Sequence, residues 1–271
     1  ALEVASDGFT VSGALASGDR IEATASGSIT DVGSTETTVS NVKVYNSNDE
    51  DVTASYSGIT TEKGTLTITK RTVILTSASD TKEYDGTALT NSNVTASGDG
   101  FVSGEGATYT VTGSQTIEGS SKNKFTYELN AGTKAGNYDI SKVEGTLTVT
   151  PKDTAIVVTG DSDSKKYDGT ALTVASDGFT VSGTLASGDR IEATVSGSIT
   201  DVGSVETTVS NVKVYNSSDE DVTASYSGIT TEKGTLTITK RAVTLTSASD
   251  TKVYDGTALT NSNVTASGDG F

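Results

Sequence analysis

The 271-residue chain contains no cysteine, histidine, methionine or tryptophan. Without cysteine and histidine it has no disulfide bonds, no thiolate or imidazole nucleophile and none of the usual zinc ligands. Proline occurs once, whereas glycine occurs 29 times among many threonine, serine and valine residues. This composition favours β-strands separated by turns and argues against helices.

Positive charge is also scarce, because 19 lysine and arginine residues face 35 aspartate and glutamate residues and give a net charge of −16. We therefore expect no nucleic-acid partner and no binding to an anionic membrane surface. No apolar run approaches the roughly 18 residues of a membrane span, so membrane insertion is not expected either. No signal peptide opens the chain, which leads us to expect a piece excised from a longer protein.

A nine-residue motif, Lys-x-Tyr-Asp-Gly-Thr-Ala-Leu-Thr, occurs three times, beginning at Lys82, Lys165 and Lys252. Its Asp-Gly pair is typical of a turn, because aspartate can bond its own backbone two residues on and glycine tolerates positive φ. We therefore predict a structural corner between two strands at each copy. The predicted corner residues are Tyr84, Asp85, Gly86, Tyr167, Asp168, Gly169, Tyr254, Asp255 and Gly256.

The chain is built from repeats. When residues 1–101 are laid on residues 171–271, only eight of the aligned pairs differ. The three corner tyrosines divide this period into two nearly equal parts, so the repeat is about 85 residues long and two types, A and B, alternate. The predicted boundaries are 1–70 (B type, without its opening strand and corner), 71–151 (complete A), 152–240 (complete B) and 241–271 (start of an A).

Alternating patterns predict which strand residues face a core. Val73 and Leu75 are kept in both copies of their segment, whereas position 74 changes from isoleucine to threonine, so Val73 and Leu75 should point inward. Leu147 and Val149 follow the same rule between threonines. We predict an all-β chain of six to eight short strands per repeat, each repeat a small two-sheet module of Ig-like sandwich or β-grasp-like type.

The junctions between repeats are short, for example residues 150–154, and contain no Gly/Ser linker. Little backbone freedom should remain there, so the modules should form a stiff, elongated tandem array. The first repeat lacks an opening strand, which is either dispensable or supplied by a neighbouring chain. The segment 241–271 is too short to bury a core and should lean on the preceding repeat, pair with another molecule or be poorly ordered.

The corner motif, followed later in the repeat by Gly-Thr-Leu-Thr-(Val/Ile)-Thr, resembles the YDG-type and related mostly-β modules found in tandem in large bacterial surface proteins and adhesins. The resemblance covers the whole chain as successive copies. It implies a stalk or repeat region at the cell surface or cell wall, outside the cell, and it supplies no catalytic residues. A host glycan or protein would then be bound through another domain.

The corner side chains have alternative readings. Each corner tyrosine could stack on a sugar or pack at the edge of a small core with its hydroxyl on a backbone group, and burial statistics favour packing. Nearby lysines could shield the corner aspartates or form an isopeptide crosslink, and the surface reading is favoured because lysine is rarely buried. These lysines are Lys82, Lys166 and Lys252.

Two acidic loops are candidate calcium sites, since they gather hard oxygen ligands, although neither follows the EF-hand pattern. Their candidate ligands are Asn48, Asp49, Asp51, Asp219 and Asp221. A run of charged residues such as these more often forms a solvent-exposed loop that binds no metal. No other cofactor is expected. An active site is not expected either, because a short repeated module with tight turns offers no insertion that could build a pocket.

Three functional hypotheses follow. The first is a stiff acidic spacer that projects a functional domain. The second is weak binding of glycan or protein by each repeat, strengthened by avidity. The third is self-association into filaments through strands exchanged between the incomplete end repeats.

Overall fold

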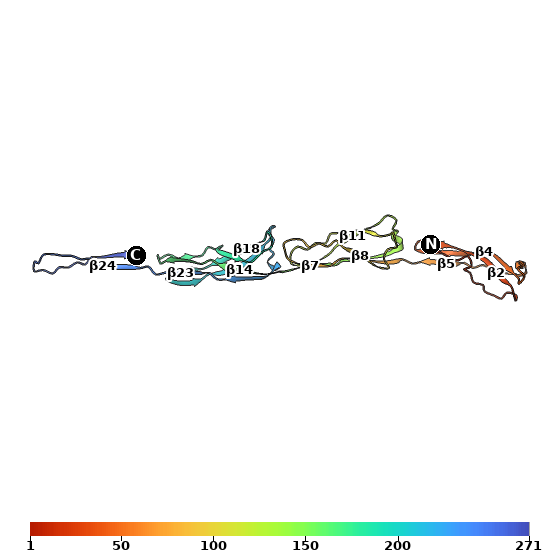
Figure 1. Ribbon diagram of the computed structural model, residues 1–271, viewed down its shortest axis with the longest axis horizontal. Helices are drawn as coiled ribbons and strands as arrows, with labels where there is room; N and C mark the ends of the chain where they lie inside the picture. Colours follow the sequence, from red (N-terminus) through yellow and green to blue (C-terminus); the bar gives the residue numbers. More distant parts are fainter. Residues whose placement is uncertain (271) are drawn as a thin grey trace. The chain divides into compact units, whose positions relative to one another are not determined.

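The computed structural model describes residues 1–270 and belongs to the all-β class, with about half of the residues in strands (Figure 1). No α-helix occurs in this range, and the helical content consists of three single turns of 3₁₀ type, η1 (Thr53–Ser55), η2 (Ala135–Asn137) and η3 (Thr223–Ser225). The all-β prediction is confirmed. The sheets are small, with two or three strands each.

The chain divides into two compact units. The first comprises residues 1–79, 91–113 and 122–146, and the second comprises residues 80–90, 114–121 and the chain from 147 onward. Both units draw on the 71–151 repeat, whose strands are shared between them. This division follows spatial contacts, whereas the repeat boundaries follow sequence similarity and stay a prediction. The last residue of the 241–271 repeat, Phe271, lies outside the described residues.

The first repeat belongs to the first unit. Its longest strand, β4, pairs through its second half with β2 and through its first half with β5, both antiparallel. Strands β1 and β3 form a separate two-residue pair. The strands are β1 (Leu2–Glu3), β2 (Arg20–Ser26), β3 (Ser28–Ile29), β4 (Gly33–Tyr45) and β5 (Gly64–Ile68).

The rest of the first unit surrounds strand β6. This strand lies between β8, which is antiparallel to it, and β12, which is parallel. Val73 and Leu75 on β6 are fully buried and pack with Phe125 and Tyr138, which confirms the predicted inward face. The strands are β6 (Arg71–Ser77), β8 (Val94–Gly98), β9 (Ala107–Val111), β11 (Phe125–Leu129) and β12 (Tyr138–Val143).

A mixed sheet of order β10-β13-β7 closes the A repeat. Its strands are β7 (Asp80–Glu83), β10 (Gly119–Lys122) and β13 (Thr146–Thr150), and β13 runs parallel to β7. Leu147 and Val149 are buried, as their alternation with threonine predicted. The A repeat thus contains eight strands, within the predicted range.

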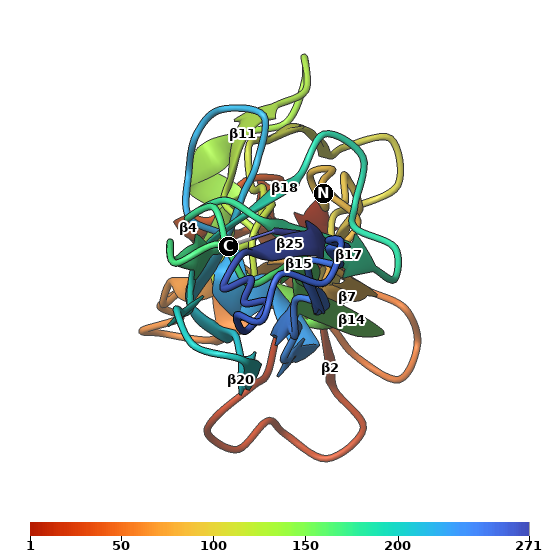
Figure 2. The same ribbon diagram turned by 90° about the vertical axis from the view of Figure 1, so that its left-hand side faces the viewer.

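The complete B repeat lies in the second unit, and its central strand is β14. This strand pairs antiparallel with β17 and parallel with β22 (β14 and β17 are labelled in Figure 2). The order β17-β14-β22 repeats the pattern of β8-β6-β12, and a second sheet has the order β15-β23-β20. Ile156 and Val158 on β14 are fully buried.

This B repeat contains ten strands, more than the six to eight predicted. The difference includes the two-residue strands β16 and β19, which are too short to produce an alternating pattern. The strands are β14 (Lys152–Gly160), β15 (Asp163–Lys166), β16 (Leu172–Thr173), β17 (Phe179–Ser182), β18 (Arg190–Ser196), β19 (Ser198–Ile199), β20 (Gly203–Glu206), β21 (Thr208–Tyr215), β22 (Tyr226–Glu232) and β23 (Thr235–Thr239).

The described chain ends in an antiparallel hairpin of β24 (Val243–Ser247) and β25 (Val264–Gly268). Its sequence repeats that of β6 and β8, but its environment differs. Leu245 is 63% exposed, whereas its counterpart Leu75 is fully buried. The apolar face of this hairpin therefore remains open to solvent.

Candidate functional site

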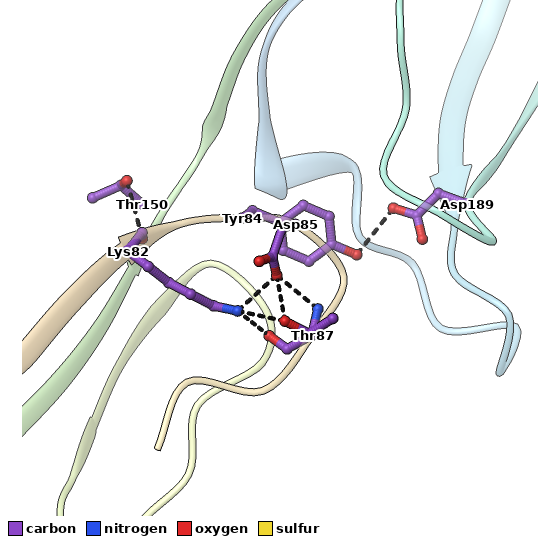
Figure 3. A network of polar contacts seen from close by, with 6 residues as sticks. All are labelled: Lys82, Tyr84, Asp85, Thr87, Thr150 and Asp189. Atoms are coloured by element: carbon purple, nitrogen blue, oxygen red, sulfur yellow. Dashed lines mark hydrogen bonds and ion pairs between the residues drawn. The ribbon is translucent and has the colours of Figure 1, made fainter. Parts of the chain in front are cut away.

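The Tyr-Asp-Gly corner after β7 is held by a network of polar contacts (Figure 3). The Lys82 ammonium donates to Asp85 Oδ1 at 2.6 Å, and the backbone N–H and hydroxyl of Thr87 donate to the same oxygen at 2.8 Å each. These contacts, led by the one from Lys82, lower the pKa of Asp85 to about 2. Gly86 has φ +82°, a conformation that favours glycine, so the Asp-Gly pair forms the turn that its sequence predicted.

The other two corners contain the same network. Lys165 pairs with Asp168, and Lys252 pairs with Asp255, at 2.8 and 2.9 Å. The prediction that Lys166 lies beside Asp168 was wrong by one position, because successive strand residues point to opposite sides. Lys166 points away from the corner and pairs with Asp269 at 2.7 Å.

Tyr84 extends from the first corner into the following repeat. Its side chain is 1% exposed, and its hydroxyl donates to Asp189 Oδ2 at 3.0 Å. The Tyr226 hydroxyl donates to the same oxygen at 2.7 Å, and the two rings meet edge to face with centroids 5.5 Å apart. Burial, followed by the bond to Asp189, raises the pKa of Tyr84. Tyr84 is packed as predicted, but its hydroxyl binds a carboxylate instead of a backbone group.

Further contacts surround Tyr84 and join the A repeat to the B repeat. Leu147 and Val149 of the A repeat share one buried cluster with residues of the B repeat, among them Ile156 and Val222. The backbone N–H of Glu118 donates a hydrogen bond to the hydroxyl of Ser225 at 3.0 Å. The corner therefore belongs to an apolar joint between two repeats, which we call the Tyr84 joint.

The same motif has different surroundings at its other two copies. Tyr167 is 39% exposed and Tyr254 is 93% exposed. The backbone carbonyl of Tyr167 accepts a hydrogen bond from Arg241 at 3.2 Å. The corner turn is thus common to all three copies, whereas burial of the tyrosine depends on the repeat that packs against it.

The joint between the first B repeat and the A repeat lies within the first unit and is polar. Asp31 accepts hydrogen bonds from Lys134 at 2.7 Å and from the side-chain amide of Asn137 at 3.0 Å. The amide oxygen of Asn137 in turn accepts from the backbone N–H of Val32 at 2.8 Å. The amide bond from Asn137, followed by that from Lys134, lowers the pKa of Asp31. We call this cluster the Asp31 joint.

The aspartates of the two acidic loops form ion pairs with lysine and arginine residues of the same chain. Asp49 pairs with Arg20 at 2.7 Å, and Asp51 pairs with Lys43 at 3.2 Å while it accepts from the hydroxyl of Thr53. Asp219 and Asp221 make the corresponding contacts with Arg190 and Lys213 in the second copy. The backbone N–H of residue 48 donates to Asn46, which turns the loop on itself.

Within residues 1–270, no group of three or more aspartate or glutamate side chains lies close enough together to hold a metal ion. The calcium ligands suggested from sequence, including Asn48, remain a prediction. None of the helical turns in the described range is long and apolar enough to cross a bilayer.

Sequence reasoning missed the partners on the far side of each joint. Asp189 stands in an Ala-Ser-Gly-Asp segment that reads only as a turn, and Asn137 carries no motif at all. The pair Asp19 and Tyr56, which bond at 2.6 Å, repeats the pair Asp189 and Tyr226. Alignment of the two copies makes this repetition visible, but neither spacing nor composition marks the pair.

No protein-family model matches the chain, and a search of curated proteins found no relative.

Proposed function

We propose that this chain is a spacer, made of tandem two-sheet modules in an elongated array, that holds a functional domain away from a bacterial surface. The observation that carries the proposal is the Tyr84 joint, where the sharpest motif in the sequence packs one repeat onto the next. A motif that served ligand binding would present its aromatic ring to solvent in every complete repeat, whereas Tyr84 is buried.

Two properties of the joints support a mechanical role. The Tyr84 joint combines a buried apolar cluster with two tyrosine hydroxyls that donate to one carboxylate. The joint should resist bending, because moving the two repeats apart would expose the apolar cluster to water and break these hydrogen bonds. The Asp31 joint relies on a charged cluster at an exposed edge, which is weaker in salt. An alternation of apolar and polar joints gives a spacer with stiff and compliant positions at regular intervals.

The role is non-enzymatic in this proposal. Carboxylates with lowered pKa values, such as Asp85 and Asp221, accept hydrogen bonds from neighbouring lysine and threonine residues, and these contacts explain the lowered pKa values. The net charge of −16 keeps neighbouring spacers apart in solution and at a crowded surface.

Small-angle scattering of the whole chain tests the proposal. We expect a pair-distance distribution with a long tail, and a Tyr84→Ala variant should shorten that tail because its joint can bend. Tyr254→Ala is the matched control, since Tyr254 is almost fully exposed, and it should leave the curve unchanged. A compact scattering profile for the unaltered chain would reject the spacer.

A further inference from the structure

The Asp31 joint and the Tyr84 joint share one backbone contact. In the Asp31 joint, the backbone N–H of Val32 donates to the side-chain oxygen of Asn137 at 2.8 Å. In the Tyr84 joint, the backbone N–H of Glu118 donates to the hydroxyl of Ser225 at 3.0 Å. Each donor directly precedes the glycine that begins a strand, β4 or β10, and each acceptor is the last residue of a 3₁₀ turn, η2 or η3. The two joints therefore place equivalent residues against each other.

The tyrosine that follows each 3₁₀ turn supports this equivalence. The Tyr138 hydroxyl donates to Glu105 and accepts from the backbone N–H three residues before that glutamate, at 3.1 Å. The Tyr226 hydroxyl donates to Asp189 and accepts from the backbone N–H three residues before that aspartate, at 2.8 Å. The A repeat and the B repeat thus present the same framework to the repeat that precedes them.

The side chains differ where the backbone contacts agree. Asp31, directly before the donor residue of its joint, pairs with Lys134 at 2.7 Å. Ile117, directly before the other donor, packs against the buried cluster that includes Val222. Lys134 and Val222 both lie directly before their 3₁₀ turns. One joint therefore combines a carboxylate with an ammonium group, and the other combines an aliphatic side chain with an apolar cluster.

We propose that these side chains form a recognition code between adjacent repeats, in which the exit surface of one repeat type fits the entry surface of the other type. The exit surface contacts the following repeat of the same chain, and the entry surface contacts the preceding one. The proposal does not rest on the spacer function, because it concerns only which repeat follows which. The code residues are Asp31 (exit, B type), Ile117 (exit, A type), Lys134 and Asn137 (entry, A type), and Val222 and Ser225 (entry, B type).

Both B repeats carry the same code residues. The exit aspartate recurs as Asp201, and the entry residues recur as Val52 and Ser55. None of the eight differences between residues 1–101 and 171–271 falls on these positions. The code therefore distinguishes the two repeat types and not the two copies.

The two mismatched orders differ in cost. A B repeat followed by another B would bring its exit aspartate against Val222, which is 2% exposed, and a carboxylate without a partner is costly among apolar groups. An A repeat followed by another A would bring Ile117 against Lys134, whose side chain is 63% exposed and stays hydrated. The code should therefore exclude B beside B strongly and A beside A weakly.

The test measures amide hydrogen exchange in variants of the full chain, since the N–H groups of Val32 and Glu118 each cross one joint. Ile117→Asp places a B-type exit on a B-type entry, and exchange at Glu118 should become faster by roughly tenfold or more. Ile117→Asn removes the same apolar contact without adding a charge and should have a smaller effect. The difference between the two variants should shrink as pH is lowered from about 7 to about 3, because the aspartate becomes neutral.

The Asp31 joint supplies the reciprocal test at more exposed side chains. Asp31→Ile places an A-type exit on an A-type entry, and exchange at Val32 should become roughly two- to fivefold faster, the effect of one exposed ion pair. Adding Lys134→Val and Asn137→Ser completes the A-to-B combination and should reverse that change. Asp201→Ile is the matched control, because it makes the same substitution in an identical loop where the aspartate is exposed, and exchange at Val32 should not change.

Two results would overturn the proposal. One is equal exchange at Glu118 in Ile117→Asp and Ile117→Asn at neutral pH, because the joint would then not distinguish a charged side chain from a neutral one. The other is exchange at Val32 that stays as fast in the triple variant as in Asp31→Ile, because matched side chains would then contribute nothing to the contact between repeats.

Discussion

Removal of a single hydroxyl group tests the Tyr84 joint most directly. Tyr84→Phe keeps the ring and its edge-to-face contact with Tyr226 but deletes the hydrogen bond to Asp189. A hydrogen bond to a charged group contributes about 1.5–3 kcal/mol, and Asp189 retains the Tyr226 hydroxyl, so we expect a loss at the low end, about 1–2 kcal/mol. For a unit of this size, that loss lowers the melting temperature by roughly 2–8 °C.

The same motif supplies its own control. Tyr254→Phe makes the identical chemical change at a ring that is 93% exposed, and its effect should lie within about 0.5 kcal/mol of zero. Scanning calorimetry of the full chain can separate the two units if they melt independently, and hydrogen exchange near residues 186–189 locates the loss. Equal effects of the two substitutions would refute the reasoning, because the structure places only Tyr84 against a carboxylate.

Two further predictions concern the corners. Gly169→Val places a β-branched residue at φ +78° and should destabilise the B repeat by about 1–2 kcal/mol or more, measured by urea unfolding, whereas Gly136→Val, at a position without positive φ and with open space, should be milder. An unaltered melting temperature for Gly169→Val would count against a structural corner. Because the folded pKa of Asp85 is about 2, below the ordinary value near 3.9, its contribution is present above about pH 4 and is lost as pH falls toward 2. Asp85→Asn should flatten the pH dependence of the melting temperature in that window, and an unchanged slope would contradict the network.

The contacts within the Tyr-Asp-Gly corner could be predicted from the sequence because they join residues that are close together in the chain. Asp85, Gly86 and Thr87 are adjacent in sequence, and the bonds among them depend on covalent neighbours and one lysine three residues earlier. Such short-range chemistry is identical in all three copies, so the motif predicts it. The error at Lys166 arose where the side of the strand, and not the spacing, decided which lysine reaches Asp168.

Alternation predicted the inward residues of longer strands for a related reason. Successive side chains of a strand point to opposite faces, so Val73, Leu75, Leu147 and Val149 could be assigned without knowledge of their partners. Two-residue strands such as β16 have no period, and they escaped prediction. The parallel pairing of β6 with β12 was also beyond a local pattern, because it joins segments that lie far apart in the sequence.

The sequence by itself determined the β class, the alternating repeat and the turn at each Tyr-Asp-Gly corner, since these depend on composition, on periodicity and on bonds between near neighbours. Only the tertiary structure decided that Tyr84 is buried on Asp189 while Tyr254 is open, and that β14 pairs with β17 on one side and with β22 on the other. Whether a side chain is buried depends on which distant segment of the chain packs against it. Identical residues therefore acquire different roles once their neighbours differ.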